Sequence, residues 1–307
     1  MHVLCVSLSA TIQRTLRFDS FSPDAVNRTR TWREDASGKA VNAARVLNQL
    51  SPGCALVLCP VGRANADHFM RLAENDAALR LHPVFVAGAT RECWTLLDAK
   101  RATTTEVIAD ESQDAADAAD AERALLAAAH DRMPRADALL LAGSRPPQWT
   151  EDLMPRLCAL AADAGKIILA DFRGAELLRT LAVCTPHIIK INEEEFCQTF
   201  LDGRADDEAA LHDAIAAKSA ELRNIVIVTR GKYDTLAAQH GAPFRCPTET
   251  VPAPVNTTAC GDSFAAGFLH DYLRTRDMRS ALQQGTHCAA LNAQNIVPGA
   301  IRGADTK

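Results

Sequence analysis

The sequence predicts an α/β domain in which helices cover both faces of a mostly parallel central sheet. In the second half of the chain, short runs rich in Val, Ile and Leu alternate with segments of helical periodicity. Such strands are typical of a parallel sheet that is buried on both faces. Several other strand-like runs carry Thr and Arg and are too polar for that core, which predicts a separate small sheet. We see no internal repeat or linker, so we expect a single domain over residues 1–307.

The first half of the chain begins with a central strand at residues 3–8, which are mostly apolar. The small sheet is expected from the runs 12–18 and 27–33 and from a hairpin formed by 92–98 and 103–108. It therefore spans roughly residues 11–35 and 90–110. The remaining expected elements of this half are helices at 43–50, 67–79 and 112–130 and strands at 55–61 and 84–86.

The second half contains the alternation that defines the fold. Its expected strands are 138–142, 166–170, 187–191 and 224–229. Its expected helices are 150–164, 174–182, 193–200, 207–222, 262–275 and 278–292, with a hairpin of 235–238 and 244–246 before the last two.

Composition excludes several classes of partner. The chain is 48% hydrophobic and 23% charged, with a formal net charge of -5, so neither a nucleic-acid surface nor a membrane partner is expected. No apolar run approaches the length of a membrane span, and the first residues lack the basic flank of a signal peptide. The ten cysteines are scattered without metal-binding spacing, which indicates a reduced, cytoplasmic protein.

The stretch 256–263 carries the clearest chemical signal. The small residues Ala259, Cys260 and Gly261 come directly before Asp262 and a long helical run. Free N–H groups at a helix start attract a phosphate, whereas a carboxylate there would repel it. The carboxylate makes chemical sense if it removes a proton from an alcohol that attacks a phosphoryl group. The alternative is an acid that merely complements the helix dipole.

Other polar residues are expected at the same edge of the sheet. In an open parallel sheet, ligands bind beyond the carboxyl ends of the strands. Segments 143–147, 190–195 and 229–231 each follow or end a strand and would meet Asp262 there. No P-loop and no dinucleotide-binding glycine motif is present. Asp171 also ends a strand at this edge, but it fits the turn that ends the strand as well, so we leave it out of the site.

Taken in chain order, these segments resemble the ribokinase-like, PfkB family of carbohydrate kinases, in particular its 1-phosphofructokinase and tagatose-6-phosphate kinase branch. Seven segments match in the family's order: 7–15, 37–42, 90–91, 143–147, 192–195, 229–231 and 256–263. The resemblance implies a three-layer α/β/α sandwich with the small sheet as a lid. It also implies an ATP- and Mg²⁺-dependent kinase of a sugar, in particular a sugar phosphate, and a dimer contact through the lid.

The resemblance also implies a role for individual residues. Asp262 would be the base, assisted by the backbone of Ala259, Cys260 and Gly261. Contacts to the sugar or its phosphate would come from Gln13, Gly38, Lys39, Asn42, Arg91 and Ser144. ATP would lie along Lys190, Thr229, Gly231 and Asn256, and Asn192 with Glu195 would organise Mg²⁺.

Several of these residues fit a structural role equally well. Asn192 followed by Glu195 matches a helix-capping pair. Arg91 fits an exposed strand, Lys39 a solvated loop, and Ser144 the cap of a turn. These alternatives stay open at the level of sequence.

The chain departs from the family pattern at six positions. Gln13 stands where an aspartate is usual, and Asn256, Ala259 and Cys260 replace the commoner Asp, Gly and Ala. Ser37 and Ala40 replace two glycines. Two alternatives to a sugar-phosphate kinase therefore stay open: a kinase of an unphosphorylated sugar or nucleoside, and a degenerate, non-catalytic binding relative.

Overall fold

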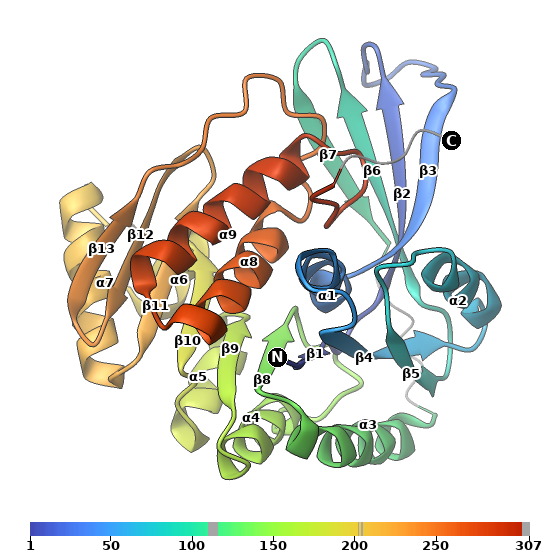
Figure 1. Ribbon diagram of the computed structural model, residues 1–307. Coiled ribbons are helices and arrows are strands. Elements are labelled where there is room, and N and C mark those ends of the chain that lie inside the picture. The colour runs from blue at the N-terminus through green and yellow to red at the C-terminus, as the bar shows by residue number, and fades with distance from the viewer. Residues whose placement is uncertain (110–115, 202, 204, 303–307) are drawn as a thin grey trace.

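The computed structural model describes residues 1–109, 116–201, 203 and 205–302. Within these residues, a nine-stranded sheet has the order β13-β12-β11-β10-β9-β8-β1-β4-β5 (Figure 1). Its strands are β1 (Val3–Val6), β4 (Ala55–Gly62), β5 (Leu81–Val86), β8 (Ala138–Ala142), β9 (Ile167–Asp171), β10 (Ile188–Asn192), β11 (Ile225–Arg230), β12 (Tyr233–Gln239) and β13 (Ala242–Cys246). All neighbouring pairs from β5 to β11 are parallel, and β12 and β13 are antiparallel.

Helices cover both faces of this sheet, as predicted. One face carries α1 (Lys39–Leu50), α2 (Ala66–Glu74), α8 (Cys260–Thr275) and α9 (Met278–Ala293). The other carries α3 (Ala118–Arg132), α4 (Leu153–Asp163), α5 (Gly174–Val183), α6 (Glu193–Phe200) and α7 (Glu208–Leu222). A short 3-10 helix (Met133–Arg135) follows α3.

Strand β8 shows why the central strands are apolar throughout. All five of its residues are buried. Leu140 packs into the core beneath α1 and α8, whereas Leu139 and Leu141 pack into the core on the opposite face. Because successive side chains of a strand point to opposite faces, a sheet covered on both sides needs apolar residues at every position.

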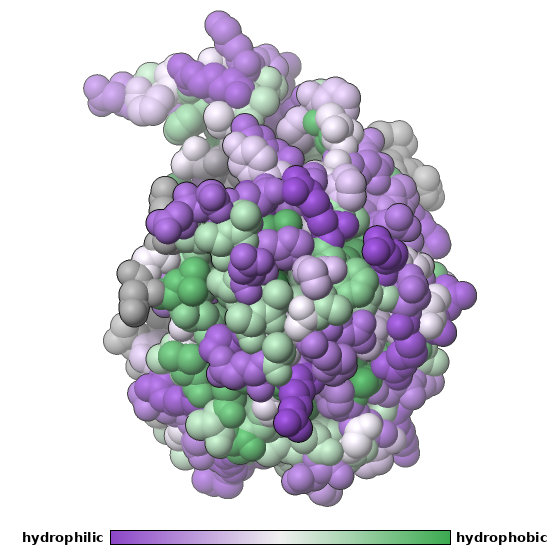
Figure 2. Space-filling model, turned by 90° about the vertical axis from the view of Figure 1, so that its left-hand side faces the viewer, coloured by the Kyte–Doolittle hydropathy of each residue, from purple (hydrophilic) through white to green (hydrophobic). Residues whose placement is uncertain are grey.

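The small sheet has the order β3-β2-β6-β7 and projects from the body of the molecule (Figure 1). Its strands are β2 (Thr11–Phe18), β3 (Thr31–Ser37), β6 (Arg91–Asp98) and β7 (Thr103–Ile108). Seen from the β13 edge of the main sheet, its projecting tip is mostly hydrophilic (Figure 2). The hairpin 92–98/103–108 therefore joins this sheet, as the sequence indicates.

The polar strand expected at 27–33 lies four residues later than predicted. Asn27 closes a loop, because its amide bonds the backbone of Ser22 in both directions, at 2.9 and 2.7 Å. The strand begins at Thr31, where the pairing with β2 starts, and continues to Ser37. Its last residues are buried, whereas Thr31 and Trp32 are exposed.

Other boundaries differ where a side chain competes for the backbone. The helix expected at 67–79 ends at Glu74, and Asp76 instead accepts the N–H of Ala78 at 2.9 Å. The helix expected from residue 150 begins at Leu153, because Thr150 donates to Glu122. In the helix expected at 112–130, residues 112–115 lie outside the described part of the chain.

No helix of the described residues is long and apolar enough to cross a bilayer.

Candidate active site

Asp262 lies in the first turn of α8, at the carboxyl edge of the main sheet. The residue is 7% exposed, and its Oδ2 accepts a hydrogen bond of 2.9 Å from Nδ2 of Asn42 in α1. Burial raises the pKa of the Asp262 carboxyl to about 6. Lys39 opposes this rise, Asp171 adds to it, and Asn42 and Lys190 oppose it. A pKa near neutrality suits a general base, because the ionised form dominates at pH 7 yet still holds a proton well.

Asp171, which the sequence analysis leaves out of the site, is buried among the candidate site residues. It ends β9, is 1% exposed, and pairs with two lysines that come from different elements. Lys39 Nζ lies 2.9 Å from its Oδ1, and Lys190 Nζ lies 3.2 Å from its Oδ2. Burial raises the pKa of the Asp171 carboxyl, but the two ammonium groups outweigh burial and hold it below the ordinary value.

Lys39 is held in its charged form by the acids around it. Burial lowers the pKa of the Lys39 ammonium, but Asp171, Asp262 and Glu195 together raise it above its ordinary value. Gly38 precedes it with a φ of 123°, a conformation that favours glycine. A Cβ on Gly38 would also lie 3.1 Å from the carbonyl oxygen of Ser9.

Three small residues, Ala259, Cys260 and Gly261, form the start of α8. Ala259 has a φ of 66°, in the left-handed region, which costs about 1 kcal/mol for a residue other than glycine. A Cβ on Gly261 would lie 2.9 Å from Lys190 Nζ, so the Lys190 ammonium lies beside the helix start. The Cys260 N–H donates to the Thr257 carbonyl at 3.2 Å and is thus already used.

The Cys260 thiol is not activated by the helix start. Its Sγ lies 3.5 Å from the carbonyl oxygen of Ala289 and accepts from Asn292 at 3.3 Å. Burial raises the pKa of the Cys260 thiol to about 11. The thiol is therefore neutral at pH 7.

A cavity of about 530 Å³ opens beside the helix start and is large enough for a nucleotide. Thr229 lines it from the end of β11 and Gly231 from the β11–β12 turn, while Cys260, Gly261 and Phe264 line it from α8. Gly231 has a φ of 61°, which explains a glycine at this turn. These two predicted nucleotide-binding positions thus share one cavity with the start of α8.

Asn256 shapes the loop before α8 and is not among the residues that line this cavity. It is 1% exposed, its Nδ2 donates to the Ile296 carbonyl at 2.9 Å, and its Oδ1 accepts the Thr258 N–H at 3.0 Å. Both ends of the amide are therefore engaged inside the protein.

Asn192 and Glu195 form the capping pair that the sequence left open. Asn192 Oδ1 accepts the Glu195 N–H at 2.8 Å, and Glu195 Oε2 accepts the Asn192 N–H at 2.9 Å. The other carboxylate oxygen, Oε1 of Glu195, lies 3.8 Å from Arg173 Nε. No group of three or more His, Cys, Asp or Glu that could hold a metal ion occurs in the described residues.

The remaining predicted sugar contacts lie at the base of the small sheet and at the end of β8. Gln13 is 3% exposed, and its Nε2 donates to Thr95 Oγ1 at 2.6 Å. Arg91 begins β6, and its Nε donates to Thr11 Oγ1 at 2.9 Å. Ser144 is exposed and follows the carboxyl end of β8.

Comparison with known proteins decides the family. The model of the pfkB family of carbohydrate kinases matches residues 2–305. The chain belongs to the pfkB family of carbohydrate kinases. It is thus a phosphotransferase with an alcohol group as acceptor, as the resemblance implied.

Relatives of this pfkB kinase extend over its whole length. It is 28% identical over 320 residues to a 1-phosphofructokinase of Xanthomonas campestris, covering 99% of this chain and 96% of the relative. A Thermotoga maritima structure named as a possible 1-phosphofructokinase has a TM-score of 0.85 at 18% identity, covering 100% of this chain and 95% of that one. Phosphofructokinase-2 of Escherichia coli, in complex with substrates and products, has a TM-score of 0.84 at 16% identity, with 99% and 96% covered. At such identities the two structures establish the fold.

Two buried residues that contact the candidate site residues are not among those that the sequence predicts. Asp171 was set aside, although its position at the end of a strand is the signal that selected other residues. Arg45, one turn after Asn42 in α1, is 2% exposed. Arg45 lies off the apolar positions 43, 46, 47 and 50 of this helix, so helical periodicity gives no signal that it is buried.

Proposed function

We propose that this kinase transfers the γ-phosphoryl group of ATP to a hydroxyl of a phosphorylated ketohexose or a similar sugar phosphate. The observation that carries the proposal is the setting of Asp262: a buried carboxylate at a helix start, next to a nucleotide-sized cavity and two lysines. The Xanthomonas relative named 1-phosphofructokinase supports the choice of a sugar phosphate.

Asp262 takes the proton of the attacking hydroxyl. Its pKa of about 6 leaves it ionised at pH 7 before the sugar binds. The Asn42 amide, 2.9 Å away, holds the carboxylate in one orientation, and its second N–H is available to a sugar hydroxyl. The transferred phosphoryl group meets the start of α8 at Gly261, where the helix dipole and the Lys190 ammonium favour the charge that develops on its oxygens.

ATP occupies the cavity between the β11–β12 turn and helices α8 and α9. Thr229 and Gly231 would contact it from one wall, and Lys190, whose ammonium lies beside Gly261, would face the phosphates. Mg²⁺ fits the donor set: it keeps several waters, takes few protein carboxylates, and is bound mainly through substrate phosphates. Glu195, with Oε1 outside the capping pair, and Asn192 would hold it, and it would neutralise charge on the phosphates.

The phosphate already present on the sugar is held by cationic residues. Lys39 and Arg91 supply the charge, and Ser144 supplies a hydroxyl at the neighbouring strand end. Gln13 would contact sugar hydroxyls with the part of its amide that Thr95 and Cys93 leave free. An arginine is well suited to a phosphate, because its planar fork donates two hydrogen bonds at once.

The small sheet acts as a lid and as a contact between two copies of the chain. On the face that carries Thr104 and Glu106 it touches the loop before α8: Thr258 Oγ1 donates to Glu106 Oε1 at 2.9 Å. Strand register puts Trp32 and Val107 on the opposite face, 59% and 50% exposed. Exposed large apolar side chains on one face favour burial against a partner.

All ten cysteines are free thiols, which supports a cytoplasmic location.

The test is ATP consumption with a panel of sugars, sugar phosphates and nucleosides, with and without Mg²⁺. We expect turnover with a ketohexose phosphate, loss of turnover on chelation, and loss of turnover in Asp262→Asn. Turnover of free sugars that Arg91→Ala leaves unchanged would instead support a kinase of unphosphorylated substrates. An Asp262→Asn enzyme as active as the parent would overturn the assignment of the base.

A further inference from the structure

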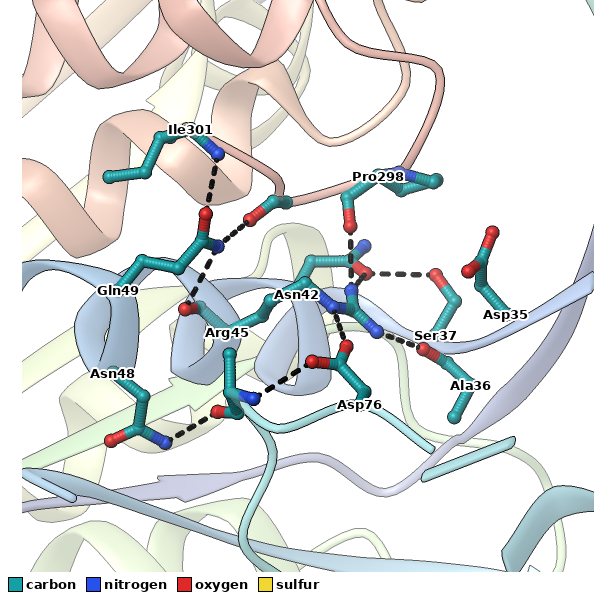
Figure 3. A network of polar contacts seen from close by, with 12 residues as sticks. Asp35, Ala36, Ser37, Asn42, Arg45, Asn48, Gln49, Asp76, Pro298 and Ile301 are labelled. Atoms are coloured by element: carbon teal, nitrogen blue, oxygen red, sulfur yellow. Dashed lines mark hydrogen bonds and ion pairs between the residues drawn. The ribbon is translucent and has the colours of Figure 1, made fainter. Parts of the chain in front are cut away.

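Arg45 is a buried arginine at the centre of a network of hydrogen bonds that includes Asn42 (Figure 3). It projects from α1 and is 2% exposed. Its Nη1 donates to Asn42 Oδ1 at 3.1 Å and to the Pro298 carbonyl at 2.6 Å. Its other guanidinium nitrogens donate to the Ala36 carbonyl and to Asp76. Such complete burial is rare for an arginine unless its charge is paired, and here Asp76 and the backbone carbonyls provide the partners.

The contact with Asn42 decides which way that amide points. An asparagine amide has an acceptor oxygen on one side and a donor NH₂ group on the other. The guanidinium has only donors, so the side of the amide that meets Arg45 has to be the oxygen. Ser37 Oγ also donates to Asn42 Oδ1, at 2.9 Å, but a hydroxyl can equally accept and cannot select one orientation alone.

We propose that Arg45 is a positioning residue that locks the Asn42 amide with its NH₂ group toward the Asp262 carboxylate. The inference rests on the proposed role of Asp262 as the base. Arg45 does not touch the reacting atoms and acts only through Asn42. Ser37, which replaces a glycine of the family pattern, supplies a second donor to the same oxygen.

The fixed orientation of the Asn42 amide matters most when Asp262 is protonated. A free amide would then turn its oxygen toward the carboxyl group and accept the proton, which stabilises the protonated acid. Arg45 prevents that rotation, so the Asn42 NH₂ group favours only the ionised base. The charged groups that face Asp262 are Lys39 from α1, Asp171 from β9 and Lys190 from β10, and the Cys260 thiol precedes it in α8. These groups are unchanged in an Arg45 variant.

The same network ties α1 to the C-terminal segment, which provides a matched control. Gln49, one turn after Arg45, donates to the Gly299 carbonyl at 2.8 Å and accepts the Ile301 N–H at 2.9 Å (Figure 3). Among the described residues, Gln49 makes no hydrogen bond to Asn42, so it does not influence which way that amide points. Gln49→Ala therefore loosens the C-terminal segment, as an Arg45 variant does, but it leaves the Arg45–Asn42 hydrogen bond and the orientation of the amide unchanged.

The experiment is the pH profile of kcat/KM for the parent, Arg45→Met, Arg45→Lys and Gln49→Ala. The sugar phosphate titrates near pH 6 in every assay alike, so differences between variants report the enzyme. On the acid side of the profile, we expect kcat/KM of Arg45→Met to fall at a pH about one unit higher than in the parent. A shift of this size corresponds to the free energy of about one hydrogen bond. The activity of Arg45→Met above pH 8 should approach the parent's. Arg45→Lys, again a pure donor, should restore the parental profile, and Gln49→Ala should keep it at lower stability.

A second measurement needs neither substrate nor nucleotide. The difference in unfolding free energy between each protein and its Asp262→Asn derivative, followed against pH, reports the proton affinity of Asp262 in the folded state. It should show the same upward shift in Arg45→Met. In an Asn42→Ala background, Arg45→Met should add no further shift, because the amide that it orients is gone.

Unchanged acid limbs in Arg45→Met, or an equal loss of activity at every pH, would overturn the proposal and leave Arg45 a purely structural residue. If Arg45→Met does not fold, Arg45→Met/Asp76→Asn removes the carboxylate that would be left unpaired and is read in the same way. Failure of the base assignment is distinguishable, because Asp262→Asn would then be active whatever the Arg45 variants show.

Discussion

Replacing Asp262 with asparagine should make the enzyme inactive and more stable at the same time. Asparagine keeps the size of the side chain and an oxygen for the Asn42 NH₂ group but has no charge. Folding buries the carboxyl and raises its pKa from 3.8 to about 6. The folded protein therefore binds more protons than the unfolded chain between these values, and its stability falls as the pH rises through that window.

The magnitude follows from the same shift. A rise from 3.8 to about 6 corresponds to about 3 kcal/mol of lost stability above pH 6, as an upper bound. Asp262→Asn escapes this loss, so we expect it to be about 2–3 kcal/mol more stable than the parent at pH 7 and equal to it below pH 4. Loss of a general base lowers kcat by about 10²–10⁴-fold.

Urea unfolding from pH 4 to pH 8, with kcat measured on the same preparations, tests both effects. Ser263→Ala is the matched control, since Ser263 follows in the same helix turn and its buried hydroxyl has no hydrogen-bond partner among the described residues. It should keep its activity, with a stability change that does not depend on pH. A less stable Asp262→Asn at pH 7, or one with parental kcat, would refute the reasoning.

Three further predictions concern the surroundings of the base and the lid. Asp171→Asn leaves Lys39 and Lys190 without their shared carboxylate and should lower the free energy of unfolding in urea by about 3–5 kcal/mol. It also removes a charge that raises the pKa of Asp262, so kcat/KM should fall at a lower pH on the acid side of its profile than in the parent. A fall at a higher pH would contradict this. Cys260, with a thiol pKa of about 11, should resist alkylation by iodoacetamide at pH 7.5, as measured by mass spectrometry of the folded protein, and rapid labelling would contradict this raised pKa. Trp32→Glu should convert a dimer into a monomer in light scattering, whereas an unchanged mass would exclude this face of the lid.

Much of the fold could be predicted because it depends on local patterns. Apolar runs such as 138–142 and 224–229 predict buried parallel strands, and the observed strands match them within a residue or two. The polar strand at Thr31–Ser37 was misplaced because a turn closed by Asn27 is not visible as periodicity. The helix boundary at Glu74 was missed because Asp76 turns toward Arg45, a residue in another helix.

By itself, the sequence determined that the chain forms a parallel sheet covered on both faces and that Asp262 opens a late helix at the carboxyl edge of that sheet. Both follow from residue order, since apolar periodicity selects the strands and the strand ends then share one edge. Only the tertiary structure decided how the site is charged. Asp171 meets Lys39 across 132 residues, and Asn42 meets Asp262 across 220. Pairings between such distant residues leave no mark in local pattern, because they depend on how the strands and helices pack.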